Sequence, residues 1–426
     1  MSSGLDVALV GFLIFLVLLV VNWSLARSLL DPAVALAAVW ALTFLLFALT
    51  SEQFYGVSWT ALLIYISGLA AFSLGAQLGK GIPLQAKRPA TYGARSDHLI
   101  LWFLFIILLL GLPFYLGYIR QFTNTALFSS TFFLDVRRGM LSQSADLVRV
   151  PIVNNLVVLS SIAAVMAFVL TESGRRWRLL VAGIVALAFF YNLLTAAKSG
   201  VLNLLVMLFV IHALQRGRLP KQALLFVVGL FVVFFGVVTV QRARAIGGDI
   251  GSLTAMAHAT LEQLARYVAC GPIGFSEYLK NPQSVPPVWS PWRFFERTAN
   301  YFGPYFDVPS LHAAFLPIGD DLFYNVYTVF FSYFPAYGMV GVVGFMLVMG
   351  GIAGAAYRRA RQQRLFWQLL YAAIFNGVLV SICTEGWLLA LNPIIKLAVV
   401  AAVVIVLRRL HIRRRSVNTA AKEVCV

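Results

Sequence analysis

The amino-acid sequence predicts an all-α protein that crosses a membrane many times. Of its 426 residues, 61% are hydrophobic and only 12% are charged, and the mean hydropathy is +0.86. These values lie well outside the range of an ordinary soluble domain. The apolar residues also gather in long runs, and about 20 such residues are enough for one helix to cross the hydrocarbon core of a bilayer. We therefore expect a polytopic helical protein whose first partner is the lipid bilayer.

Eleven runs are long and apolar enough to form membrane spans. They lie near residues 7–26, 32–50, 58–79, 98–118, 150–170, 179–197, 200–214, 222–241, 323–357, 365–384 and 387–407. The ninth run is too long for one crossing, and Pro335 and Gly338 mark a break in it. We therefore expect Phe323 to Tyr337 to form a separate helix at the outer interface.

The basic residues predict which side of the membrane each connector faces, because cytoplasmic connectors retain Lys and Arg. With the N-terminus outside, the inner segments hold most of the 33 Lys and Arg residues. The formal net charge of +17 then forms a basic collar at the cytoplasmic face, and we expect no nucleic-acid partner. The chain divides into eight spans in residues 1–241, a large external loop in 242–322, and three spans with a basic cytoplasmic tail in 323–426.

The three cysteines give no sign of a metal centre. Cys270, Cys383 and Cys425 lack the spacing of metal ligands, and their odd number argues against a disulfide framework. The sequence also lacks a Cys/His cluster and a Gly-rich phosphate loop. We expect neither a metal nor another cofactor.

Basic residues on the predicted outer face are the first candidates for a functional site, because Arg and Lys there run against the usual sorting. Arg137 and Arg138 lie in the external loop 119–149, and Lys198 lies where the sixth and seventh spans almost meet. Arg242 and Arg244 end the eighth span. They are two positions apart, and residues at this spacing on a helix point to different faces. Solvated charges near headgroups, or a lysine that reaches the interface along its stem, account for such residues equally well.

The external loop contains one predicted helix and one aromatic stretch. Residues 252–268 have an apolar side and a polar side, and Glu262 and Arg266 form a favourable i, i+4 pair. Residues 281–321 combine many aromatic rings with Arg293 and other polar groups. This composition suits sugar stacking, and an aromatic belt at the membrane interface has the same composition.

Three short motifs in the second half of the chain resemble those of one family. They are the segment from Tyr267 to Pro282 with its Gly-Pro pair, Asn325-Val-Tyr-Thr328, and Tyr337-Gly-x-x-Gly341 before an apolar helix. In this order they resemble the bacterial O-antigen or oligosaccharide repeat-unit polymerases (Wzy type), over about residues 180–357. The chain departs from the family at Lys198, where an Arg is usual. It departs from the related O-antigen ligases at Tyr324, where a His is usual.

This resemblance implies a GT-C-like glycosyltransferase of the bacterial inner membrane. Such an enzyme moves a growing glycan from undecaprenyl pyrophosphate to the non-reducing end of a new lipid-linked repeat unit at the periplasmic face. Donor and acceptor are then both lipid-linked oligosaccharides, and a chain-length regulator is a further partner that the resemblance allows. An O-antigen ligase or another polyprenyl-linked glycan transferase is the alternative. A flippase for the same lipid fits less well, because the sequence lacks the internal repeat common in transporters.

The implied chemistry assigns roles to particular residues. The departing pyrophosphate needs fixed cations when no metal neutralises it, and Arg offers it paired donors. The candidates for substrate binding are Arg137, Arg138, Lys198, Arg242, Arg244 and Arg293, together with Asn325 and Tyr327. The acceptor hydroxyl needs a general base, and the external candidates are Asp321, Asp320, His312 and Glu277. We expect Asp321 first, because a helix would place it one turn before Asn325.

Overall fold

A computed structural model gives the structure of most of the chain. It describes residues 2–50, 54–82, 95–123, 125–127, 129, 131–142, 151–170, 175–195, 198–217, 221–222, 224–225, 228–230, 232, 236, 253–282, 290–303, 305–308, 315–320 and 322–424. About 81% of the structure is helical, which confirms the predicted all-α membrane class. Its two strands form one small antiparallel hairpin.

The chain forms two compact units, each built from segments that are far apart in the sequence. Unit 1 comprises Met1–Ala86, Ser252–Arg359 and Ala373–Ile394, and unit 2 comprises Lys87–Gly251, Ala360–Ala372 and Ile395–Val426. The division into three consecutive parts that the sequence suggests stays a prediction.

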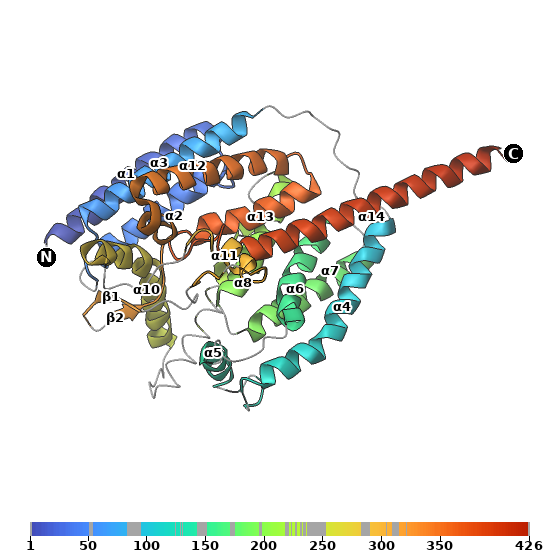
Figure 1. The fold of residues 1–426 in the computed structure, drawn as a ribbon, viewed down its shortest axis with the longest axis horizontal. Helices are drawn as coiled ribbons and strands as arrows, with labels where there is room; N and C mark the ends of the chain where they lie inside the picture. The colour runs from blue at the N-terminus through green and yellow to red at the C-terminus, as the bar shows by residue number, and fades with distance from the viewer. Residues whose placement is uncertain are drawn as a thin grey trace. The chain divides into compact units, whose positions relative to one another are not determined.

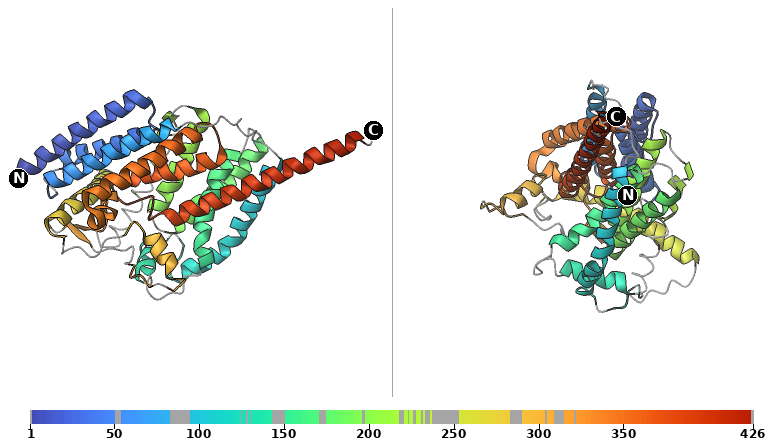
Figure 2. Two further views of the ribbon diagram at one scale, coloured as in Figure 1. Left: turned by 45° about the horizontal axis from the view of Figure 1, so that its top comes forward. Right: turned by 90° about the vertical axis from the view of Figure 1, so that its right-hand side faces the viewer.

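Unit 1 contains three N-terminal helices, the helices and strands of the predicted external loop, and a long C-terminal helix. Its elements are α1 (Ser2–Ala26), α2 (Pro32–Leu49), α3 (Trp59–Gly81), α10 (Leu253–Lys280), α11 (Arg293–Ala299), β1 (Leu316–Gly319), β2 (Leu322–Tyr324), the 3-10 helix η2 (Val329–Ser332) and α12 (Phe334–Ala360). The second half of α13 (Leu365–Val380) and the start of α14 (Leu391–Val424) complete it. Figures 1 and 2 show α1, α3 and α12 running side by side.

Local sequence signals explain where α2 and α3 begin. Asp31 caps α2, since its carboxylate accepts the backbone N–H of Ala33 at 3.1 Å, and Pro32 occupies the first turn. Ser58 caps α3 in the same way by accepting the N–H of Ala61 at 3.2 Å. The Ser58 cap also ends the α2–α3 connector, residues 50–58, on which the β1–β2 hairpin packs.

The contact between α3 and α12 depends on glycines. A Cβ on Gly75 or Gly79 of α3 would lie 2.0 Å from a backbone oxygen of α12, and a Cβ on Gly350 or Gly354 would lie 2.1 Å from one of α3. Both pairs have the small-x-x-x-small spacing that lets helix backbones approach closely in a membrane. The two helices therefore pack backbone to backbone.

Aromatic rings fill the interior of unit 1. Trp40 of α2 lies 4.9 Å from Tyr65 of α3 and 5.4 Å from Phe330 of η2, ring centre to ring centre. Phe275 of α10 lies 5.6 Å from Tyr65, whose hydroxyl donates to the carbonyl of Pro272 at 2.8 Å. The loop helix α10 is thus packed into the same core as the membrane helices.

Unit 2 is a helical bundle with several polar contacts inside it. Its elements are α4 (Arg95–Arg120), α5 (Phe132–Ser142), α6 (Pro151–Leu170), α7 (Arg175–Leu194), α8 (Lys198–Arg216), the first half of α13 and most of α14. The Tyr191 hydroxyl donates to the carbonyl of Leu108 at 2.8 Å, and Lys396 of α14 donates to Asn155 of α6 at 2.5 Å. Such contacts satisfy polar groups that would be costly in lipid.

The helices agree with most of the predicted spans. Within the described residues, seven helices are long and apolar enough to cross a membrane, and three shorter apolar helices lie at 155–170, 365–380 and 391–407. The predicted span 222–241 falls largely outside the described residues, so the total of eleven stays a prediction.

The expected interfacial helix from Phe323 to Tyr337 is wrong. Residues 322–324 form β2, residues 325–328 have no regular secondary structure, and only the 3-10 turn η2 precedes α12. The backbone here bonds to a distant segment, with the Val329 N–H donating to the carbonyl of Ser381 at 2.9 Å. The break at Gly338 is confirmed, since this residue has φ 59° and ψ −152° inside α12, which glycine adopts without strain.

The predicted helix at 252–268 is confirmed, and it is longer than expected. α10 continues through Pro272 to Lys280. The predicted pair between Glu262 and Arg266 is present as an ion pair and hydrogen bond.

Candidate functional site

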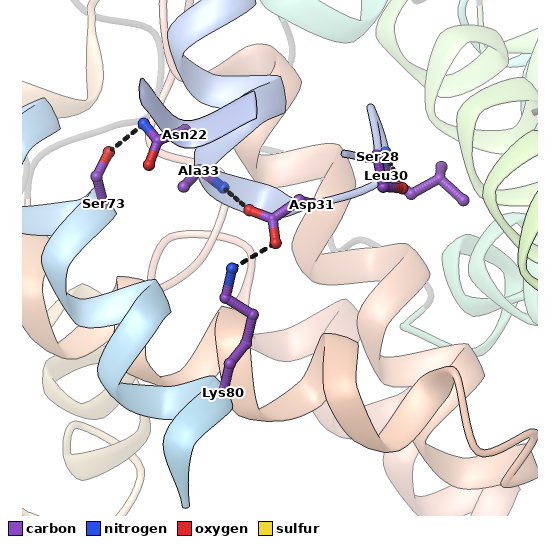
Figure 3. A network of polar contacts seen from close by, with 7 residues as sticks. All are labelled: Asn22, Ser28, Leu30, Asp31, Ala33, Ser73 and Lys80. Atoms are coloured by element: carbon purple, nitrogen blue, oxygen red, sulfur yellow. Dashed lines mark hydrogen bonds and ion pairs between the residues drawn. The ribbon is translucent and has the colours of Figure 1, made fainter. Parts of the chain in front are cut away.

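A charged network lies at one end of unit 1. We name this end of the unit the Asp31 end. Asp31 is fully buried, and its carboxylate accepts a 2.6 Å ion pair from Lys80 at the end of α3 (Figure 3). The Arg358 guanidinium of α12 donates to the carbonyl of Ile82 at 2.8 Å and to that of Lys80. The end of α3 is thus bound to the start of α2 and to the end of α12.

The β1–β2 hairpin marks the opposite end, which we name the Asp320 end. The hairpin pairs Leu316 with Tyr324 and Pro317 with Phe323, and it packs on the α2–α3 connector, because the Tyr55 N–H donates to the Ile318 carbonyl at 2.9 Å. A Cβ on Gly56 of that connector would lie 2.9 Å from the Cα of Gly4. The start of α1 therefore lies at this end as well.

Asp320 lies in the turn of this hairpin and is exposed. Its carboxylate accepts a hydrogen bond from the Tyr55 hydroxyl at 3.3 Å, so the α2–α3 connector helps to orient it. Asp321 lies outside the described residues. The expectation that a helical turn joins Asp321 to Asn325 is wrong, because β2 lies between them and a strand advances about 3.3 Å per residue.

Tyr324 ends β2 in contact with α10. Gln263 of α10 donates to its hydroxyl, and the rings of Tyr324 and Tyr267 meet edge to face at 5.8 Å. Burial raises the pKa of Tyr324 to about 12, with further contributions from Tyr267 and Cys270. Tyr324 is therefore a neutral phenol at ordinary pH and does not supply the basic group that a His would supply there.

Asn325 and Tyr327 follow β2 in a segment without regular secondary structure, and they have different surroundings. Asn325 is exposed, whereas Tyr327 is buried and meets the ring of Phe331 edge to face at 4.8 Å. The Tyr327 N–H donates to the carbonyl of Cys383 at 3.3 Å. The segment 325–329 is therefore paired with residues 381–383, which we name together with residues 384–390 the α13–α14 connector.

The α13–α14 connector contains a buried carboxylate that the sequence analysis did not single out. Glu385 is 2% exposed, and it accepts four hydrogen bonds. The donors are the Tyr333 hydroxyl at 3.0 Å and the backbone N–H groups of Trp387 at 3.0 Å, Leu388 at 3.0 Å and Leu389 at 2.6 Å. A glutamate between two apolar runs was the only sequence signal, because its donors are visible only in the fold.

This connector reaches the middle of the unit 1 helices. The Trp40 indole N–H donates to the hydroxyl of Ser381 at 3.1 Å, and the Trp387 ring stacks on Phe72 of α3 at 5.6 Å. Tyr333 in turn stacks on Phe345 of α12 at 4.7 Å. Glu385 thereby ties the connector to the residues just before α12.

Arg293 of unit 1 is one of the residues predicted to bind substrate, and its side chain is buried. It begins α11 and is 4% exposed. Burial lowers the pKa of its guanidinium to about 10, as does Arg297, while Glu296 opposes them. Arg293 is therefore still charged at neutral pH. The preceding residue, Trp292, donates its indole N–H to the Tyr337 hydroxyl at 2.7 Å. The residue next to Arg293 therefore contacts the third motif.

Unit 2 carries the remaining described candidates. Asp135 of α5 lines a cavity of about 290 Å³ together with Gln121, Phe122, Thr123 and Thr125. Arg138 is exposed three residues further along α5, and Arg137 lies in the same helix, although its side chain is outside the description. Lys198 begins α8, and its side chain is likewise not described.

The other predicted residues divide into two groups. Glu277 of α10 forms a 2.5 Å ion pair with Lys280. His312, Arg242 and Arg244 lie outside the described residues, as does Asp321. Within the described part of the chain, no group of three or more His, Cys, Asp or Glu side chains could hold a metal ion.

Comparisons of the chain with protein-family models, with curated proteins and with solved structures find no match.

Proposed function

We propose that this protein polymerises lipid-linked oligosaccharide repeat units at the outer face of a bacterial inner membrane. In the proposed reaction, an acceptor sugar hydroxyl attacks the anomeric carbon of the glycan carried on undecaprenyl pyrophosphate. A new glycosidic C–O bond forms, the bond to the pyrophosphate oxygen breaks, and the acceptor proton passes to a base. The lipid pyrophosphate leaves, and the longer glycan remains on the acceptor lipid.

One observation carries the proposal most strongly, namely that the first two of the three motif segments meet in space. Tyr267 of the first motif packs against Tyr324 beside the second. Both are joined to the α13–α14 connector, because Cys383 donates its thiol to the Tyr267 carbonyl and accepts the Tyr327 N–H. Segments that resemble one family are expected to build one site, and these segments are neighbours.

Two described side chains of unit 1 suit the proposed roles. Asp320 is an exposed carboxylate held by Tyr55, so it is our first described candidate for the base. Arg293 is a buried guanidinium that remains charged, and such a group stabilises a departing pyrophosphate best where water is excluded. Residue 324 is a tyrosine, whereas a ligase is expected to have a histidine in this place, and this difference favours a polymerase.

The test is reconstitution of the purified protein with fluorescent lipid-linked repeat units in liposomes. A polymerase converts them into a ladder of products that differ by one repeat unit, and it releases one lipid pyrophosphate per step. Transfer of substrate across the liposome membrane without a ladder would instead identify a flippase. Attachment of one glycan to a different lipid acceptor, again without a ladder, would identify a ligase.

A further inference from the structure

Two of the three cysteines lie together in unit 1, although 112 residues separate them in the sequence. Cys270 of α10 and Cys383 of the α13–α14 connector both donate their thiols to the carbonyl oxygen of Tyr267, at 3.3 Å and 3.4 Å. The two sulfur atoms are therefore no farther apart than the sum of these distances. Both are free thiols in this structure.

The backbone beside the two cysteines is also in close contact. A Cβ on Gly271 of α10 would lie 2.0 Å from the carbonyl oxygen of Ile382. Gly271 follows Cys270 and Ile382 precedes Cys383, so the two segments touch at the residues next to the thiols. Disulfides need Cα atoms about 4.4–6.8 Å apart, and a close approach of the two backbones beside the cysteines is what such a bond requires.

We propose that Cys270 and Cys383 form a disulfide that joins α10 to the α13–α14 connector. The oxidant is the disulfide of a thiol oxidase in the compartment outside the membrane. Two S–H bonds break and one S–S bond forms, while two electrons and two protons pass to the oxidase, whose disulfide becomes two thiols. The inference rests on the outward placement of α10 and does not require glycan transfer.

Burial determines when this bond forms. Cys270 is 1% exposed in the folded protein, and burial raises the pKa of its thiol well above the usual value. Because the thiolate is the reactive form, the packed thiol reacts slowly. The disulfide therefore forms while α10 and the connector are still accessible during folding, and packing then protects it from reduction.

The test counts free thiols in the full-length protein from intact cells. Cells are quenched in acid, the protein is denatured, and a polymer-linked maleimide adds a fixed mass to each free thiol. The acid and the denaturant also release any bound metal, so protection from the maleimide reports covalent bonding. We expect one adduct in the wild-type protein without reductant, at Cys425, and three after reduction.

Variants assign the bond and separate it from other modifications. Cys425→Ser should give no adduct before reduction and two after it. Cys270→Ser and Cys383→Ser should each free the partner thiol, giving two adducts with or without reductant. Cells that lack the thiol oxidase should give three adducts in the wild type without reductant.

Three adducts in normal cells without reductant would overturn the proposal. The proposal would also be overturned if Cys383 did not react with the maleimide in the Cys270→Ser variant. A modification other than a bond to Cys270 would then protect that thiol. Labelling of Cys425 by an impermeant maleimide on intact cells would show that the orientation is reversed. In that orientation α10 would face the cytoplasm rather than the compartment of the thiol oxidase, and the proposed disulfide would not form. This outcome does not depend on the result of the ladder assay.

Discussion

Asp320 is the residue whose replacement tests the proposed base most simply. Its carboxylate is exposed in the hairpin turn and accepts a hydrogen bond from the Tyr55 hydroxyl. If it accepts the acceptor proton, Asp320→Asn removes general-base catalysis, which typically contributes about 10²–10⁴ in rate. We expect the rate of ladder formation by the purified variant to fall by at least about 10²-fold.

Asp6→Asn provides the matched control, because Asp6 is another exposed carboxylate of unit 1, on α1. It should form ladders at the wild-type rate. Equal rates for both variants would remove Asp320 from the reaction and leave the base among the remaining candidates.

Glu385 tests a different property, the stability of unit 1. Glu385→Ala leaves the Tyr333 hydroxyl and three backbone N–H groups without their acceptor. Each buried donor left unpaired costs about 1–3 kcal/mol, so this variant should unfold at a clearly lower temperature in detergent. Glu385→Gln keeps one acceptor oxygen, which receives three of the four bonds, and should fall between Ala and the wild type.

Glu262→Ala is the control for this series, because Glu262 forms a partly exposed pair with Arg266, worth only about 0.3–0.5 kcal/mol. Thermal unfolding followed by gel filtration of the fluorescent fusion protein compares the variants. A Glu385→Ala protein as stable as Glu262→Ala would show that the four hydrogen bonds do not hold the connector.

Sequence spacing predicted polar contacts only within one element. The pair of Glu262 and Arg266 follows from their positions one turn apart, because helix geometry alone brings them together. Glu385 and Tyr333 are 52 residues apart, and no local pattern relates them. For the same reason, the contact of Tyr55 with Asp320 could not be foreseen, since it depends on how the hairpin packs on the α2–α3 connector.

The glycines between α3 and α12 allow the backbones of these two helices to pack closely. Gly354→Ala places a Cβ 2.1 Å from the Ala76 carbonyl oxygen, and rigid backbone cannot move aside as a side chain can. We expect the two helices to separate and the protein to lose at least about 1–3 kcal/mol, the usual cost of overpacking. Thermal unfolding in detergent measures the loss.

Gly344→Ala is the control on the same helix, since a Cβ there meets nothing within 4 Å. Alanine is favoured over glycine in a helix by about 0.5–1 kcal/mol, so this variant should be as stable as the wild type or slightly more stable. If Gly354→Ala behaved like Gly344→Ala, α3 and α12 would not pack as closely as the structure has them.

Hydropathy predicted elements well where the membrane decides the structure. Long apolar runs become helices because each helix satisfies its own backbone in lipid, and this requires no knowledge of neighbours. The prediction failed at residues 323–337, where the backbone partner is the α13–α14 connector. The aromatic and β-branched residues of Phe323 to Thr328 do favour a strand, but hydropathy counts them as part of a span.

The two ends of unit 1 agree with the predicted alternation of connectors. The Asp31 end brings together three segments that are expected on the cytoplasmic side, near Asp31, Lys80 and Arg358. Segments expected outside, at Gly4 and at Tyr55 and Gly56, meet at the Asp320 end. The predicted spans therefore identified which connectors share an end of unit 1, because successive spans run in opposite directions. Which end faces the cytoplasm stays a prediction from the distribution of Lys and Arg.

Labelling of introduced cysteines tests which end faces outward. An impermeant maleimide on intact cells should label Ser3→Cys and Thr298→Cys, and it should not label Lys87→Cys or Arg415→Cys. Lysis should make the last two reactive, which controls for accessibility. Labelling of Lys87→Cys in intact cells would reverse the orientation and place the Asp320 end in the cytoplasm.

In the proposed reaction, fixed side-chain cations, rather than a metal ion, stabilise the departing pyrophosphate. The most direct measurement is the ladder assay with purified protein and lipid-linked repeat units in excess EDTA, compared with the same reaction supplied with Mg²⁺ or Mn²⁺. We expect ladders of equal rate and length under both conditions. Loss of the ladder in EDTA and its recovery with either metal would contradict it.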